Sequence, residues 1–360
     1  MILEKNLKNI SKIHGIEILR FISALAILIW HYRHFSYPLV TPLSLEIQPF
    51  FNFLKIFYTR GYLGVNFFWC ISGFIFFWKY GNMIKDIKFK IFFKSRFSRL
   101  YPLCFLTLII ITILQKIYFN YAESYYVYQI NDSFHFILHL LLASNWGFDK
   151  GLSFNGPIWS ISTEIIIYGI FFIALKTFKN SFLLNISIIL VCLTFKIFYE
   201  DQASVIIDCT LFFFIGGSVN FISNYLKNIS KIKLKFFLLA IIILSIYIII
   251  DRNINNINNF TYLFQLFFYP IIIYLFCDIS IVNKKISNFF SLLGNLTFSS
   301  YLLHFPIQIL IKLFYLNIDK EIPVLNSYFF IFYLSIVLII SYFSYNYFEY
   351  PMKNYIRKKL

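Results

Sequence analysis

Ten long apolar segments follow one another along the chain, and no other feature of the sequence restricts the fold as strongly. Each segment is about 17 to 24 residues long, which lets a helix cross a hydrocarbon core about 30 Å thick. Hydrophobic residues make up 59% of the 360 positions, more apolar surface than a soluble domain can bury. We therefore expect an all-α fold, a polytopic membrane helix bundle of about ten spans in a single domain with no appended soluble domain. The expected spans lie near residues 15–35, 62–79, 100–119, 160–178, 181–198, 204–223, 234–250, 260–280, 292–314 and 327–347.

The basic residues indicate how these helices are oriented. The formal net charge is +16, which in a soluble protein would suggest a nucleic-acid partner. Here the 32 Lys and Arg residues fall mostly in short loops between apolar segments, and roughly two thirds of them lie on the side of the N-terminus. We therefore predict that both termini are cytoplasmic, that membrane lipid is a partner and that nucleic acid is not. No small-residue cleavage site follows the first span, so we expect this helix to be retained.

The residue types that bind metals are present but do not form a ligand pattern. Five cysteines are scattered through apolar runs, and no pair has metal-ligand spacing. His135 and His139 are four residues apart in the longest loop expected on the outer side, residues 120–157, which we call the outer loop. No third ligand accompanies them. We expect no metal, and we interpret these two histidines as structural.

The first span, Gly15–Phe35, carries Arg20 and His31 inside its apolar run. The eleven-residue step between them is three helical turns plus about 20°, so both side chains lie on one face, about 16 Å apart along the axis. Ionisable groups inside a span are costly and usually face a polar interior or a functional pathway. A structural alternative fits the helix equally well, with Arg20 reaching the inner headgroups and His31 lying near the outer surface.

The inner segment Met83–Leu100 mixes Ile and Phe with six basic residues. This pattern predicts a basic amphipathic helix on the cytoplasmic headgroups. Within it, Arg96 and Arg99 share a helical face at the mouth of the third span. Two guanidinium groups at that place could bind phosphates bidentately, although lipid anchoring alone also explains the charge pattern.

The stretch Asn155–Gly169 opens the fourth span and contains Glu164. Glu164 and His31 each lie about one turn below the outer surface, so they are at matching depth. A carboxylate and an imidazole at one depth form a candidate acid–base pair. Glu164 could instead be stabilised by the N-terminus of its own helix, and the sequence leaves open whether the two side chains touch.

Two further ionisable residues lie beside prolines near the end of the chain. His304 precedes Pro306 in the ninth span, and we expect it to be a packed, hydrogen-bonded residue. Glu349 is expected to end the tenth span before Pro351 and to pair with the basic tail.

Taken together, several stretches resemble the acyltransferase-3 family of bacterial integral-membrane acyltransferases. The resemblance is carried, in this order, by GIEILRFISALAILIWHYRHF, RGYLGVNFFWCISGFIF, RFSRLYP, NGPIWSISTEIIIYG, LTFSSYLLHFPI and FEYP. It covers about Gly15 to Arg357, and the order and spacing of the motifs are more specific than any one of them. Two positions depart from the family pattern: Asn66 stands where Asp is common, and Ile165 stands where a second acidic residue often follows Glu164.

The resemblance implies transfer of an acyl group, commonly acetyl, from cytoplasmic acyl-CoA to a hydroxyl of a cell-envelope carbohydrate such as lipopolysaccharide, capsule or exopolysaccharide. It further implies a multi-pass protein of the bacterial inner membrane, with acyl-CoA as donor substrate. His31 would be the catalytic residue. In the mechanism that the helix geometry suggests, Glu164, or Glu17 at a distance, would orient His31 or balance its charge. The remaining roles expected are donor binding by Arg20, Arg96 and Arg99, acceptor contact by Asn155, Trp159 and Ser162, and structural support by Glu17 and His304.

The alternative from another functional class is a transporter or flippase of a lipid-linked or small polar substrate, because buried charges are equally natural in such a bundle. No inverted repeat is visible in the sequence, which favours the acyltransferase. A purely structural membrane scaffold would leave Arg20 and His31 unexplained.

Overall fold

The computed structural model describes residues 13–37, 44–178, 180–199, 205–226, 234–235, 237–239, 241–242 and 257–359. Over these ranges every regular element is a helix and no β-strand occurs, which confirms the predicted fold class. Seven of the described helices are long and apolar enough to cross a membrane. The shorter apolar helices Phe182–Phe198 and Thr261–Phe276 occupy the predicted fifth and eighth spans, and the predicted span 234–250 lies largely outside the described residues. The number of ten spans and the cytoplasmic termini therefore stay predictions.

The helices divide into two compact units that are interleaved along the chain. The first unit draws on Met1–Arg20, Val65–Ile87 and Ile166–Ser291, and the second on Phe21–Gly64, Lys88–Ile165 and Leu292–Leu360. The helices that lie mainly in the first unit are α4 (Gly64–Tyr80), α7 (Ile158–Thr177), α8 (Phe182–Phe198), α9 (Val205–Tyr225) and α11 (Ile257–Phe276). The α2 helix (His14–His31) begins in the first unit and ends in the second.

In the first unit, two glycines allow α4 and α9 to approach closely. A Cβ atom on Gly73 would lie 1.8 Å from the backbone oxygen of Phe213, and one on Gly216 would lie 1.8 Å from that of Cys70. No side chain fits at either position, so the two backbones meet directly. Small residues serve the same purpose at many helix crossings in membranes, where packing rather than water exclusion drives association.

The second unit contains the remaining helices and the candidate site. Its main elements are η1 (Tyr32–Ser36), α3 (Phe51–Arg60), α5 (Phe89–Ala122), α6 (Ser133–Leu140), α12 (Lys284–Asn317), α13 (Ser327–Ser344), the π-helix η7 (Tyr345–Glu349) and α14 (Tyr350–Lys359). Short 3₁₀ turns occur at Leu45–Ile47, Gly61–Leu63 and, in the first unit, Ile84–Asp86.

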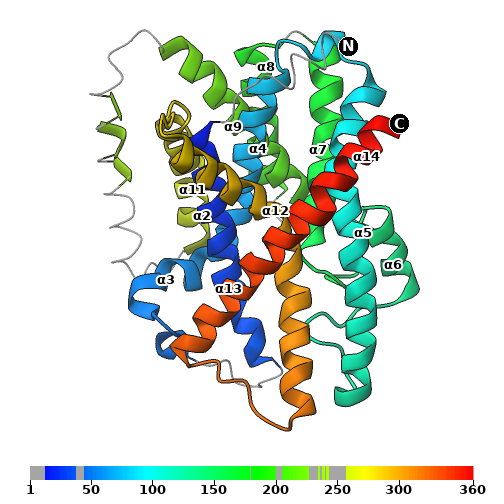
Figure 1. Cartoon of the computed structure of the whole chain (residues 1–360). Helices are drawn as coiled ribbons and strands as arrows, with labels where there is room; N and C mark the ends of the chain where they lie inside the picture. Colours follow the sequence, from blue (N-terminus) through cyan, green and yellow to red (C-terminus); the bar gives the residue numbers. More distant parts are fainter. Residues whose placement is uncertain are drawn as a thin grey trace. The chain divides into compact units, whose positions relative to one another are not determined.

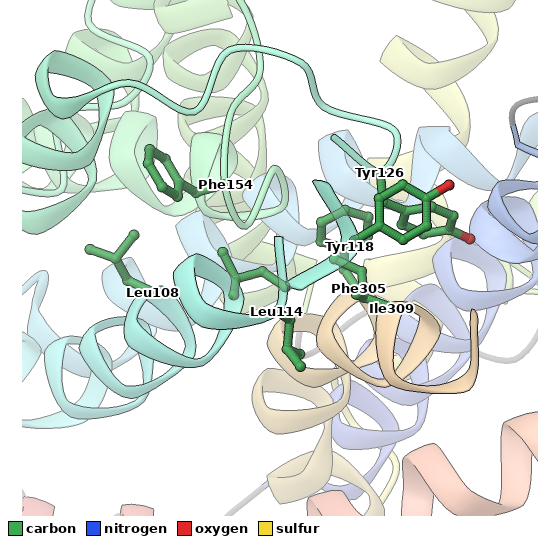
Figure 2. Packing of buried hydrophobic residues seen from close by; sticks show 8 residues of the cluster. Leu108, Leu114, Tyr118, Tyr126, Phe154, Phe305 and Ile309 are labelled. Atoms are coloured by element: carbon green, nitrogen blue, oxygen red, sulfur yellow. The ribbon is translucent and has the colours of Figure 1, made fainter. Parts of the chain in front are cut away.

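Aromatic packing joins α5 and α12 within the second unit. Tyr118 of α5 and Phe305 of α12 both contact Tyr126 of the outer loop, with ring centroids 5.3 and 6.0 Å from that of Tyr126. Figure 2 shows these rings gathered with Leu114 and Ile309 in one buried cluster. The Tyr126 backbone is also clamped by Gln115, which donates to its carbonyl and accepts from its N–H. The start of the outer loop is therefore fixed to α5.

Two helix boundaries differ from the sequence predictions. The basic segment does not form a separate surface helix, because α5 runs without a break from Phe89 to Ala122. The last span does not end at Glu349 either: α13 continues through the π turn η7 into α14, and Figure 1 shows α13 and α14 as one long rod. The π turn directly precedes Pro351, whose ring would clash with the carbonyl group of Tyr347 in a regular α-helix. A wider turn therefore lets the helix pass the proline.

Candidate functional site

The centre of the candidate site is a group of three histidines in the second unit, His31, His34 and His304, which we call the histidine cluster. Nδ1 of His31 lies 2.6 Å from Nε2 of His304, a hydrogen-bond distance. The His34 ring stacks on His31, with ring centroids 4.7 Å apart and planes inclined by 20°. His304 is fully buried, whereas His31 and His34 are partly exposed. The cluster is therefore closed on the side of His304 and more accessible on the side of His31 and His34.

The local fold of the first span produces the stacked pair. The α2 helix ends at His31 and the chain continues as the 3₁₀ turn η1. Side chains three residues apart eclipse one another in a 3₁₀ helix, which puts His34 directly beside His31. Buried Tyr32 and Phe35 anchor the turn, and the Tyr32 hydroxyl donates to the backbone oxygen of Val324.

Gln308 of α12 forms hydrogen bonds with this turn. Its Oε1 lies 3.2 Å from Nδ1 of His34, and because an amide oxygen only accepts, His34 is the donor. Its Nε2 donates to the backbone oxygen of His31 at 2.9 Å and to the Tyr333 hydroxyl at 3.1 Å. One buried amide thus fixes the backbone of His31 and the ring of His34 together.

Pro306 lies inside α12, one helical turn after Leu302. Proline has no N–H, so it leaves this carbonyl without its helical donor. The Asn155 amide donates to the Leu302 oxygen at 3.1 Å and is itself fully buried. Asn155 therefore replaces the missing helix donor, while its contact with an acceptor stays a prediction.

The same stretch that carries Asn155 also binds the middle of α12. The Tyr301 hydroxyl lies 2.7 Å from Oγ of Ser160 and donates to the backbone oxygen of Pro157 at 3.0 Å. Glu164 lies one turn further along, is partly exposed, and is within electrostatic range of Tyr301. The side-chain contacts of His31 are to the other histidines and to Trp30, and Glu164 is not among them. The predicted acid–base pair is therefore not in direct contact.

Two other residues predicted to contact the acceptor differ in exposure. Ser162 is fully buried, accepts from the Asn145 N–H at 3.1 Å, and so pins the outer loop to α7. The backbone oxygen of Ser162 accepts from the indole N–H of Trp146 as well. Trp159 is partly exposed, and contact with an acceptor stays a prediction for both residues.

In the first unit, Arg20 forms an ion pair with Glu17. The Arg20 Nη1 to Glu17 Oε2 distance is 2.9 Å, and both side chains are about nine-tenths buried, with exposed fractions of 12% and 10%. Pairing is what makes two such charges tolerable inside a span. Glu17 is thus paired with Arg20, one helical turn away. Binding of the acyl-CoA donor by Arg20 stays a prediction.

Arg96 and Arg99 of α5 and Arg357 of α14 belong to the second unit, and we call them the arginine cluster. The Nη2 atoms of Arg96 and Arg357 both donate to Oγ of Ser95, at 3.2 and 3.1 Å, so the two guanidinium groups are close neighbours. Arg357 comes from α14 and also donates to Oγ of Ser98. Like charges repel at such a separation, and a nearby anion offsets the cost of this repulsion. The sequence alone does not place Arg357 in this cluster, because only the hydrogen bonds of α14 to α5 bring it there.

Glu349 links this cluster to α12. Its carboxylate is buried and accepts a hydrogen bond from the Ser299 hydroxyl. The charges of Arg99 and Lys353 lie within electrostatic range of it. The predicted role of Glu349 as a counter-charge for basic residues near the C-terminus thus fits the geometry, although the helix does not end there.

The outer loop contains the other two histidines that were interpreted as structural. Nδ1 of His135 lies 2.8 Å from Oδ1 of Asp132, and hydrogen bonds from the His135 backbone N–H and ring lower the pKa of Asp132. Nε2 of His139 lies 3.0 Å from Oγ of Ser153. Burial, aided by the charge of nearby His135, lowers the pKa of His139 from 6.5 to about 3. Both histidines therefore tie α6 to the loop around it.

The histidine cluster does not have the geometry of a metal site. Two nitrogen ligands of a tetrahedral zinc ion lie about 3.3 Å apart, given Zn–N bonds of about 2.0 to 2.1 Å. The 2.6 Å separation of His31 and His304 is shorter and fits a hydrogen bond. Among the described residues, no three His, Cys, Asp or Glu side chains are grouped so that they could hold a metal ion.

Comparison with known proteins gives one match. The model of a family described as an acyltransferase domain, Acyl_transf_3, matches residues 13–346, nearly the whole chain. No curated protein and no solved structure matches the chain. The matched range includes the whole histidine cluster, together with Arg96 and Arg99.

Proposed function

The chain belongs to the Acyl_transf_3 family of acyltransferase domains, and from this premise we propose what it transfers and between which partners. It is a multi-pass membrane acyltransferase that moves an acyl group, acetyl in the simplest case, from cytoplasmic acyl-CoA. The acceptor is a hydroxyl of a cell-envelope carbohydrate on the outer side of a bacterial inner membrane. The residues of the site, and not the fold alone, support this function, because one fold can serve several chemistries.

The observation that carries this proposal is a series of buried polar residues on α12. It includes Ser299, the partner of Glu349, then Tyr301 and His304, and it ends at Gln308, the partner of His34. The nine-residue step from Ser299 to Gln308 rises about 14 Å along the helix axis. At about 100° per residue, Tyr301, His304 and Gln308 share one face of the helix and Ser299 lies on the opposite face. Buried polar groups inside a span are expensive and are kept where a pathway or site needs them. α12 therefore contacts Glu349, beside the arginine cluster, and His34, within the histidine cluster, inside one unit.

The arginine cluster supplies the donor end of the proposed enzyme. Arg96 and Arg357 share one hydroxyl acceptor, and Arg99 lies near Glu349, so the cluster holds more positive than negative charge. The phosphate groups of acyl-CoA are polyanionic and match guanidinium forks in charge and geometry. Binding of the charged end at this cluster leaves the thioester arm free to extend along α12 towards the histidine cluster.

The histidine cluster supplies the chemistry. A neutral His31 takes the proton from the acceptor hydroxyl while its oxygen attacks the thioester carbonyl carbon. The resulting tetrahedral oxyanion collapses, the C–S bond breaks, and the departing thiolate takes the proton back from His31. The products are the ester and free CoA, so His31 returns to its starting state. General-base catalysis of this kind contributes about 10²- to 10⁴-fold, and the rest comes from positioning and electrostatic stabilisation.

The first test measures donor binding and acyl transfer with charge-matched variants. Arg96→Ala/Arg99→Ala removes two cations from the cluster, whereas Lys88→Ala/Lys90→Ala removes two exposed cations from the same end of α5. We expect at least about tenfold weaker acyl-CoA binding for the arginine variant alone, because each charge-assisted hydrogen bond contributes about 1.5 to 3 kcal/mol. Lysines at both positions should restore binding only partly, since an ammonium group has no fork.

The same preparations are then supplied with labelled acetyl-CoA and carbohydrate extracted from the cell envelope. Label that appears as an ester on the carbohydrate, and less of it with the arginine variant, supports the proposal. Equal losses of binding in the arginine and lysine pairs would mean that these residues only attract anions to the membrane surface. Movement of an unmodified substrate across the membrane without esterification would favour the transporter.

A further inference from the structure

We propose that His304 is a positioning residue that holds one tautomer of His31, with the proton on Nδ1 and a lone pair on Nε2. This inference rests on the proposed acyl transfer, because it names the nitrogen that acts as the base in that reaction. It starts from the only ring nitrogen of the histidine cluster that is both buried and without a hydrogen-bond partner of ordinary geometry, Nδ1 of His304.

The surroundings of His304 decide where its own proton lies. The His304 ring interacts with the backbone carbonyl groups of Ser300 and Tyr301, one turn earlier on α12. Because Nε2 is occupied by His31, we assign this interaction to Nδ1, although no hydrogen bond of ordinary geometry forms there. Carbonyl oxygens only accept hydrogen bonds, so a lone pair on Nδ1 would be repelled there while an N–H is attracted. The neutral His304 ring therefore carries its proton on Nδ1, and its Nε2 is an acceptor.

The tautomer of His31 follows from the contact between the two rings. The 2.6 Å separation between Nδ1 of His31 and Nε2 of His304 requires one donor and one acceptor. Because Nε2 of His304 accepts, Nδ1 of His31 donates. A neutral His31 then has an unprotonated Nε2, and within the described residues this atom makes no hydrogen bond. Nε2 is free to take a proton from a hydroxyl on the more accessible side of the cluster.

α12 also fixes the direction in which this lone pair points. Gln308 donates to the backbone oxygen of His31, while His304, one turn earlier, accepts from the ring. His304 is fully buried, so water does not compete for its Nε2. The arrangement has the logic of a catalytic triad, in which a buried acceptor orients a histidine base, with a neutral imidazole in place of the carboxylate. When His31 gains a proton on Nε2, its bond to His304 becomes charge-assisted and therefore stronger.

The experiment combines kinetics with nitrogen NMR of the full-length protein in detergent. His304→Phe keeps a flat ring without an acceptor, and His304→Gln places an amide oxygen near the position of Nε2. We expect His304→Phe to lose at least about 10²-fold in kcat, with KM for acyl-CoA changed less than about twofold, because donor binding takes place at the arginine cluster. His304→Gln should keep at least about a tenth of wild-type kcat on the same scale.

Spectra of ¹⁵N-histidine-labelled protein report the tautomer directly, and the signals of His31 are identified by their loss in His31→Gln. In the wild type we expect a protonated Nδ1 and an unprotonated Nε2 for His31, and in His304→Phe a mixture of both tautomers. His14→Gln is the control, since His14 lies outside the cluster and both its nitrogens bond elsewhere, to Ile281 and Ser287. Its kinetics and the His31 signals should match the wild type.

Several results would overturn the inference. They are a His304→Phe enzyme with at least half of wild-type kcat, a neutral His31 protonated on Nε2, or His34→Gln costing more than His31→Gln. If His304→Phe does not fold, the wild-type spectrum and His304→Gln still decide the question. A wild-type protein that transfers no acyl group would overturn the proposed function instead, and the spectra would still report which nitrogen of His31 holds the proton.

Discussion

Pro306 and Asn155 show how single residues maintain the site. A proline inside a buried helix exposes one carbonyl group, that of Leu302, and a fully buried amide from a distant part of the chain satisfies it. This hydrogen bond is formed at Leu302, two residues before His304, so it also helps to position the His304 ring.

This pairing predicts a measurable coupling between the two residues. Asn155→Ala leaves the Leu302 oxygen buried and unpaired, which should cost about 1 to 3 kcal/mol of stability. Pro306→Ala returns a backbone N–H to α12, so the Asn155 amide is no longer needed there. In a double-mutant cycle of thermal stability, the loss caused by Asn155→Ala should be smaller on the Pro306→Ala background. Additive effects would contradict the proposed role of Asn155.

At the scale of elements, α6 and the outer loop are held in part by His139, a histidine that must stay neutral. His139 of α6 is buried against Ser153 and the ring of Phe154. Burial lowers its pKa to about 3 in the folded loop, well below the value of about 6.5 expected in an unfolded chain. Between these values the unfolded loop binds a proton that the folded loop does not, so stability falls as the pH decreases.

The loop should therefore open in acid. We expect proteolytic cleavage or hydrogen exchange within residues 133–157 to increase as the pH decreases from 6.5 towards 3, and to be nearly constant above 6.5. His139→Gln keeps a hydrogen-bonding side chain without a titrating ring, so it should flatten this dependence. A His139→Gln loop that opens in acid as readily as the wild type would assign the transition to another group.

The crossing of α4 and α9 depends on the absence of a side chain at Gly73. Gly73→Ala would put a methyl group 1.8 Å from a backbone oxygen of α9, which must move away. We expect a stability loss of at least about 1 to 3 kcal/mol, the usual cost of overpacking. Gly169 on α7 is the matched control, because nothing lies within 4 Å of an added Cβ there. Equal thermal stabilities of Gly73→Ala and Gly169→Ala would show that the helices do not cross so closely.

For the molecule as a whole, hydropathy alone predicted the helical membrane fold, because apolar length is a property of each segment by itself. His31 could be selected as a candidate for the same reason, since a charged or titratable group inside a span is conspicuous. The partners of His31 could not be predicted, because periodicity does not show which helices are neighbours. The stacking of His34 had a signal in its three-residue spacing, whereas the contact with His304 depends on the packing of α2 against α12.

The central claim is that this membrane protein is an enzyme whose base is His31, and one substitution tests it most directly. His31→Gln keeps a polar side chain of similar reach but cannot act as a general base. Acyl transfer from labelled acetyl-CoA should fall by at least about 10²-fold, while membrane insertion and acyl-CoA binding stay near wild-type levels. If purified His31→Gln, correctly folded and able to bind acyl-CoA, kept more than about a tenth of wild-type turnover on that scale, His31 would not be the base.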